Sequence, residues 1–134
     1  MGKTVGKNLG KNDDPWVDLV VSILAVNQYS LEKTYPYVDG LRQHGLFEAS
    51  NLGSWDQSKI ARQMKLAGCD RGEFMTNLFA VRLAALGVHI QRTGIEVSLA
   101  VISGGDRAAI EKFLSPVNGV GPKVLKDFFL LRGI

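Results

Sequence analysis

The stretch from Phe113 to Val124, FLSPVNGVGPKV, decides the fold of this chain. A helical pattern ends before Pro116, Gly119-Val120-Gly121 turns the chain, and Pro122 is a residue that opens helices. Both glycines can adopt positive φ, and a ligand can approach their backbone closely because they have no side chain. The pattern predicts two helices joined by a hairpin, with Val120 as the apolar tip that pins it between them.

The hairpin also predicts a binding site for anions. The free N–H groups around residues 121–124 point outward at the positive end of the following helix dipole. Lys123 and Lys126 add positive charge in the same helix. We therefore interpret Gly119, Val120, Gly121, Lys123 and Lys126 as residues that bind DNA phosphates. The alternative is an ordinary turn between two helices that happens to use two glycines.

Basic charge gathers at the two ends of the sequence. Residues 1–12 carry three lysines and no acid, and residues 107–134 carry five basic and two acidic residues, so each end has a net charge of +3. Residues 13–106 carry eight basic and eleven acidic residues, or −3. This distribution favours a polyanionic partner. Residues 1–12 are expected to be either a solubilising flexible tail or a basic arm that lies on phosphates.

The first half of the chain reads as helices joined by short loops. Asp13 or Asp14 is expected to cap a buried helix that ends at Asn27-Gln28. Ser30 can cap a second helix, which Pro36 shortens or kinks.

Two further helices are expected between residues 54 and 87. Ser54 and Gln57 have the spacing of a capping box. The next helix is predicted over about 72–86, with Gly87 as its end. Residues 88–92 allow a short strand, for which no partner strand is evident. The apolar stripe of the 72–86 helix consists of Phe74, Leu78, Val81 and Ala85.

The last third predicts helices over 95–102 and about 107–115, the second capped by Asp106. The helix after Pro122 carries Val124, Phe128 and Leu131 on one face. We therefore expect an all-α, compact bundle of six or seven helices that ends in a helix-hairpin-helix, with residues 13–134 as one domain behind the tail of residues 1–12.

The composition excludes several classes of protein. With 46% hydrophobic and 22% charged residues, the chain is expected to be globular, and no segment is long and apolar enough to span a membrane. His44, His89 and Cys69 lack metal-ligand spacing, so no metal and no cofactor is expected. The single cysteine fits an intracellular compartment, and we interpret it as a residue at a helix terminus rather than a nucleophile. Trp16 and Trp55 are expected in the core rather than as base-stacking platforms.

The hairpin resembles that of the helix-hairpin-helix DNA glycosylases, the endonuclease III superfamily. The family signature is Leu-x-x-Leu-Pro-Gly-Val-Gly-x-Lys, and residues 114–123 read Leu-Ser-Pro-Val-Asn-Gly-Val-Gly-Pro-Lys. The likeness extends to Ile23–Ser30, ILAVNQYS, because the family's first core helix ends in an apolar run followed by Gln and then Ser or Thr. Met64–Gly68 matches a middle stretch of the family loosely. The resemblance implies the hairpin-bearing helical lobe of that fold.

By position, the resemblance implies roles for two residues. Lys123 falls where bifunctional members keep the lysine that attacks the sugar, and Gln28 falls near the residue that fills the gap left by a flipped base. The residues themselves also allow Lys123 to be only a phosphate ligand and Gln28 to cap a buried helix. The family's essential aspartate lies beyond the helix after the hairpin, where this chain stops. Asp127 is instead expected to pair with Lys123 across one helical turn.

The leading hypothesis is a non-sequence-specific DNA-binding domain with a DNA repair or DNA processing role. The enzymatic alternative is a minimal DNA glycosylase or abasic-site lyase that uses Lys123. A third possibility is a subunit that needs a second protein chain to complete an active site. DNA is the expected partner in each case, and the expected location is cytoplasmic, or nucleoid or nuclear.

Overall fold

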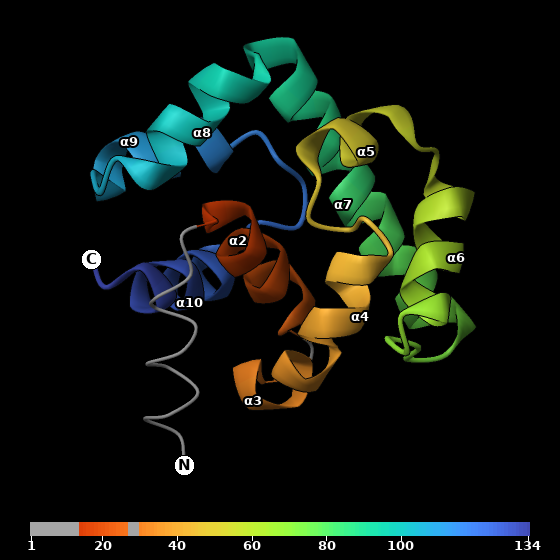
Figure 1. Ribbon diagram of the computed structural model, residues 1–134. Helices are drawn as coiled ribbons and strands as arrows, with labels where there is room; N and C mark the ends of the chain where they lie inside the picture. The colour runs from red at the N-terminus through yellow and green to blue at the C-terminus, as the bar shows by residue number, and fades with distance from the viewer. Residues whose placement is uncertain (1–13, 27–29) are drawn as a thin grey trace.

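The computed structural model describes residues 14–26 and 30–134, and every regular element in them is a helix. The all-α fold predicted from the sequence is therefore confirmed (Figure 1). The helices are α2 (Pro15–Leu24), α3 (Leu31–Thr34), the 3₁₀ turn η1 (Tyr35–Tyr37), α4 (Val38–Gln43), α5 (Ala49–Ser54), α6 (Gln57–Leu66), α7 (Glu73–Thr93), α8 (Ile95–Ser103), α9 (Arg107–Leu114) and α10 (Pro122–Arg132).

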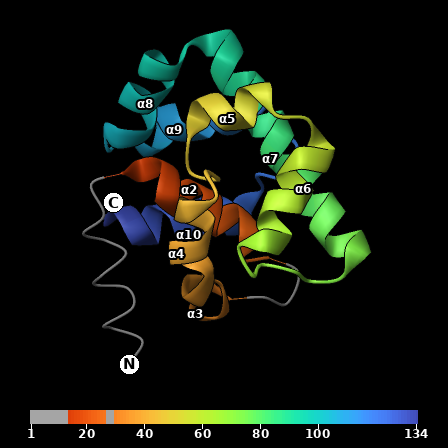
Figure 2. The same cartoon turned by 45° about the vertical axis from the view of Figure 1, so that its right-hand side comes forward.

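Helix α2 forms the centre of the core, because all ten of its residues are buried. The side chain of Asp14 caps it by accepting a hydrogen bond of 3.0 Å from the backbone N–H of Trp16, as predicted. The helix ends at Leu24, three residues before the predicted end at Asn27-Gln28. Residues 27–28 themselves lie outside the described residues. Figures 1 and 2 show the other helices arranged around α2, with α10 along one side.

Residues 30–43 form a helical segment that is interrupted at Pro36, as the sequence predicts. Ser30 caps α3 as expected, since its Oγ accepts a hydrogen bond of 3.1 Å from the N–H of Lys33. Pro36 then lies in the 3₁₀ turn η1, between α3 and α4. The interruption predicted at Pro36 is therefore confirmed, because the proline removes a backbone donor from the helical ladder.

The predicted capping box at Ser54 and Gln57 is wrong. Ser54 is the last residue of α5, and its hydroxyl donates to the carbonyl of Ser50. The cap of α6 is Asp56, whose Oδ1 accepts a hydrogen bond of 2.8 Å from the N–H of Lys59. Aspartate is as good an N-cap as serine, and Asp56 stands directly before the first residue of the helix.

The predicted end at Gly87 is also wrong, because α7 continues to Thr93 and residues 88–92 are helical rather than a strand. Gly87 lies where α5 packs against α7. A Cβ atom at Gly87 would lie 2.1 Å from the carbonyl oxygen of Leu52, so any larger residue would collide with the backbone of α5. This glycine therefore allows close helix packing instead of ending the helix.

The apolar stripe predicted for α7 does not face the core. Phe74 is 77% exposed, and Val81 and Val88 are also exposed. Helix α7 carries a second apolar stripe, which includes Phe79 and Leu83, and this stripe forms the buried face. The buried residues are Thr76, Phe79, Ala80, Leu83, Leu86, Gly87 and Ile90.

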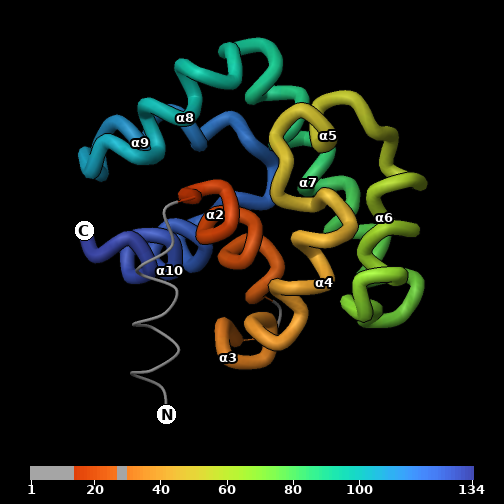
Figure 3. Tube along the Cα trace, viewed as in Figure 1, coloured from red at the N-terminus to blue at the C-terminus, as the bar shows by residue number. Residues whose placement is uncertain are grey.

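The last three helices agree with the prediction. Asp106 caps α9 through a hydrogen bond of 3.2 Å from the N–H of Ala109. In α10, Val124, Phe128 and Leu131 are buried. The connection from α9 to α10 swings toward α7 before it returns (Figure 3). None of the described helices combines the length and the apolar character that crossing a membrane requires.

Candidate nucleic-acid interface

Residues 115–121 form the turn between α9 and α10. Gly119 has φ of +98°, so the positive φ predicted there is confirmed. The same prediction for Gly121 is wrong, because its φ of −104° and ψ of −169° are extended backbone that other residues adopt. The N–H of Val120 donates to the carbonyl of Val117 at 3.2 Å, and Val120 is half-buried against the core, as expected for an apolar tip.

The first turn of α10 has backbone amides that no side chain caps. Gly121 occupies the N-cap position, and Pro122 opens the helix without an N–H of its own. An α-helix offers no intrahelical acceptor to its first N–H groups, which here include those of Lys123 and Val124. Asp14 and Asp106 satisfy such groups in α2 and α9. The start of α10 can accept an anion in the corresponding place.

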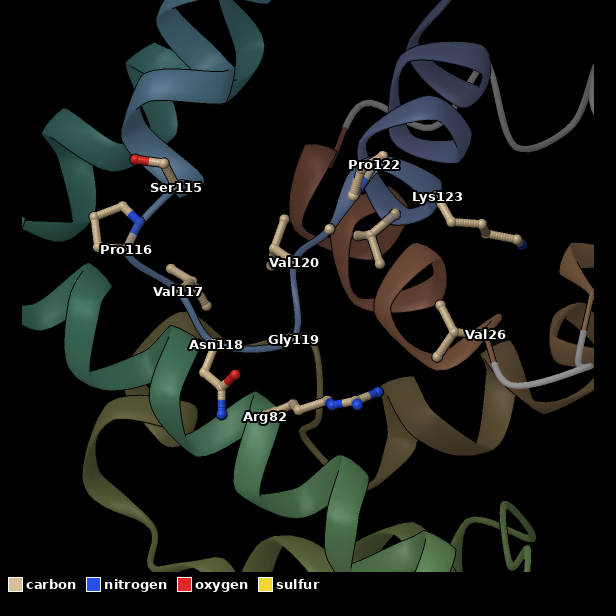
Figure 4. A pocket seen from close by; sticks show the side chains of 12 residues that line it. Val26, Arg82, Ser115, Pro116, Val117, Asn118, Gly119, Val120, Pro122 and Lys123 are labelled. Carbon is tan, nitrogen blue, oxygen red and sulfur yellow. The ribbon is translucent and has the colours of Figure 1, made fainter.

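These amides border an open hollow of about 630 Å³ (Figure 4). The structure brings four of the predicted residues, Gly119, Val120, Gly121 and Lys123, together in its lining. The remaining lining residues are Val26, Arg82, Ser115, Pro116, Val117, Asn118, Pro122 and Val124.

Two predicted DNA-binding residues are not placed in this hollow. Lys126 borders a different hollow, which it shares with Arg107 and Glu111 of α9. Gln28 lies outside the described residues, so its role stays a prediction. The chain leaves α2 through Val26, which lines the hairpin hollow.

Lys123 makes two contacts within the protein. Its Nζ donates a hydrogen bond of 2.6 Å to the carbonyl of Ala25, the C-cap of α2. It also forms an ion pair with Asp127, as the i, i+4 spacing predicts. The side chain remains 53% exposed. Lys123 therefore joins the start of α10 to the end of α2, and its charge is compensated by Asp127.

Arg82 is the residue of the hollow that the sequence analysis missed. It belongs to α7, and its Cγ and Cδ would lie 2.6 Å from a Cβ atom placed on Gly119. The side chain runs beneath Gly119, with its guanidinium on the side where Val26 lies (Figure 4). No signal in the hairpin segment points to Arg82, because the two meet only through the packing of α7 against the turn.

The other chemically reactive side chains have structural contacts. His44 Nδ1 lies 3.1 Å from Gln63 Oε1, and His89 Nε2 donates to the carbonyl of Phe113 at 2.6 Å. Burial raises the pKa of Cys69 to about 11, which keeps the thiol protonated and poorly nucleophilic. Among residues 14–26 and 30–134, no three His, Cys, Asp or Glu side chains gather as metal ligands.

The two tryptophans differ in their surroundings. Trp16 is 7% exposed and belongs to the core, as expected. Trp55 packs against the core with part of its ring, and Lys59 Nζ lies 4.9 Å from the ring centroid. Neither arrangement adds an aromatic platform to the hairpin hollow, which is lined by other residues.

Comparison of the chain with protein-family models, with curated proteins and with solved structures finds no match. The resemblance to the helix-hairpin-helix glycosylases therefore rests on the residues quoted for it.

Proposed function

We propose that this protein binds DNA without sequence specificity, by holding backbone phosphates at the turn of Gly119, Val120 and Gly121. The observation that carries the proposal is the uncapped start of α10 beside an open hollow. Backbone N–H groups and the helix dipole attract a phosphate there, and they read no base. A role in DNA repair or DNA processing, inside the cell, is part of the same proposal.

Binding of random-sequence duplexes at several salt concentrations tests this function. Fluorescence anisotropy with two duplexes of unrelated sequence should give similar Kd values. The logarithm of affinity should fall linearly with the logarithm of salt concentration, because each phosphate contact releases counterions. A Kd that depends strongly on sequence, or an absence of binding at low salt, contradicts the proposal.

The enzymatic alternative, an abasic-site lyase that uses Lys123, is less well supported by the contacts. A nucleophilic amine needs a free lone pair to attack a sugar aldehyde. The Lys123 amine donates to the Ala25 carbonyl and is paired with Asp127. These contacts direct the Lys123 amine toward Ala25 and Asp127 within the protein, so we propose binding rather than catalysis as the main activity.

A subunit that joins a second protein chain is the other candidate. The observation that favours it is the outer face of α7, where Phe74 is 77% and Val81 37% exposed and both line one hollow. Apolar side chains gathered on one surface are typical of protein interfaces. Sedimentation of the protein alone, compared with Phe74→Glu, tests whether this face joins two copies. Loss of a dimer in the variant would support self-association.

A further inference from the structure

The side chain of Arg82 is held in the hairpin hollow by its neighbours. Its aliphatic part lies against Gly119, at a distance that leaves no room for a Cβ atom on that glycine. Its guanidinium carbon lies 5.6 Å from the ring centroid of Phe79. The stem thus passes under the turn, and the charged end reaches the hollow (Figure 4).

Unlike Lys123, Arg82 has no carboxylate partner for its positive charge in the described part of the chain. Lys123 is paired with Asp127, whereas no carboxylate among residues 14–26 and 30–134 forms an ion pair with Arg82. Of the two cations that line the hollow, Arg82 is therefore the one that an anionic ligand would find without a carboxylate partner.

We propose that Arg82 is the cationic ligand of a DNA phosphate in the hairpin hollow, and that Gly119 sets its position. This inference rests on the proposed DNA-binding function and assigns the phosphate contact to a residue outside the hairpin. A guanidinium presents several N–H donors in a planar fork, which fits two phosphate oxygens at once. Lys123 is a positioning residue that holds α10 against the end of α2.

Arg82→Met and Lys123→Met form a matched pair for the test. Both variants keep an unbranched side chain and lose one positive charge. Anisotropy titrations of a random-sequence duplex should show that Arg82→Met binds about tenfold more weakly, with the salt slope reduced by about one unit. Lys123→Met should lower the melting temperature and reduce the salt slope by less than Arg82→Met does, because Lys123 is already paired with Asp127.

An unchanged salt slope in Arg82→Met, while the wild-type protein binds DNA, overturns the inference. An absence of binding by the wild-type protein contradicts the proposed function instead, so the two failures are distinguishable. If Arg82→Met does not fold, Arg82→Lys gives a second test. That variant should keep the salt slope and lose affinity, because an ammonium retains the charge without the fork.

The role of Gly119 is tested by a double-mutant cycle with Arg82. Gly119→Ala should weaken DNA binding in the wild-type background, because the new methyl group must displace the Arg82 stem. In an Arg82→Ala background there is no stem to displace, so the same substitution should have a smaller effect on Kd. Equal fold-changes in both backgrounds would show that Gly119 acts independently of Arg82.

Discussion

The carboxylate of Asp18 in α2 accepts a hydrogen bond of 2.9 Å from Arg132 at the end of α10, and Asp18 is completely buried. Its second oxygen, Oδ1, is buried without a hydrogen-bond partner in the described part of the chain. Burial raises the pKa of Asp18 to about 6, and the hydrogen bond from Arg132 opposes that rise. The two helices are therefore joined by a charged group whose burial is costly.

We predict that this pair makes stability depend on pH between about 4 and 7. The folded state binds the Asp18 proton more tightly than the unfolded state, because its pKa of about 6 lies above the ordinary 3.8. The resulting stabilisation, about 3 kcal/mol, is complete below the ordinary pKa and is lost as pH rises through about 6. Urea unfolding at pH 7 and 5 should show that the wild-type protein gains stability relative to Asp18→Asn at the lower pH. The same pH dependence in both proteins would contradict this.

Gly87→Ala should destabilise the fold although alanine is the better helix former. The methyl group would meet the backbone of Leu52 at 2.1 Å, and α5 must move away. We expect a loss of about 1–3 kcal/mol, seen as a lower melting temperature by circular dichroism. Gly121→Ala is the matched control, since a Cβ atom there meets nothing within 4 Å. Equal melting temperatures for the two variants would refute the close packing of α5 and α7.

Local signals in the sequence predict several helix starts, although not that of α6, whose cap is Asp56 rather than Ser54. Asp14, Ser30 and Asp106 cap helices as expected, because each cap satisfies amides two or three residues away. The hairpin between α9 and α10 is also predicted from local signals, because the positions of its glycines and proline favour a turn followed by a helix start.

Properties that depend on packing between distant segments are not predictable in this way. In the sequence, Gly87 has the pattern of a helix end. In the structure it lies inside α7, where the backbone of α5 packs directly against it. The exposed stripe at Phe74 and the buried stripe at Phe79 have the same helical spacing, and only the tertiary fold distinguishes them. Arg82 enters the hairpin hollow for a similar reason, because α7 brings it beneath Gly119.

Replacing Gly121 with leucine should weaken DNA binding without affecting the fold. The extended φ of Gly121 suits any residue, and the space around it is open, so the melting temperature should stay unchanged. The new side chain would project near the free amides of α10 and exclude a phosphate. We expect Kd to rise roughly tenfold for every duplex sequence. Leu130→Gln, at an exposed position of α10 that does not line the hollow, is the control.

Two results would contradict this prediction for Gly121. Wild-type affinity in a folded Gly121→Leu protein would mean that the turn is not the contact surface. A loss confined to one duplex sequence would mean that the site reads bases rather than phosphates.

Incubation with abasic DNA and borohydride should trap no covalent complex. An imine requires a free amine, whereas Lys123 donates to the carbonyl of Ala25 and is paired with Asp127. Denaturing gels report the trapped species directly. Efficient trapping that disappears in Lys123→Ala would establish the lyase activity that we consider the weaker alternative.

Titration of ¹⁵N-labelled protein with a short duplex tests the proposed phosphate contact most directly. Amide NMR spectra should show the largest shift changes at Gly121, Lys123 and Val124, where the uncapped start of α10 borders the hollow. A second duplex of unrelated sequence should shift the same amides by similar amounts, because phosphates carry no sequence information. Shift changes that leave these three amides unaffected and appear elsewhere on the surface would contradict DNA binding by the hairpin.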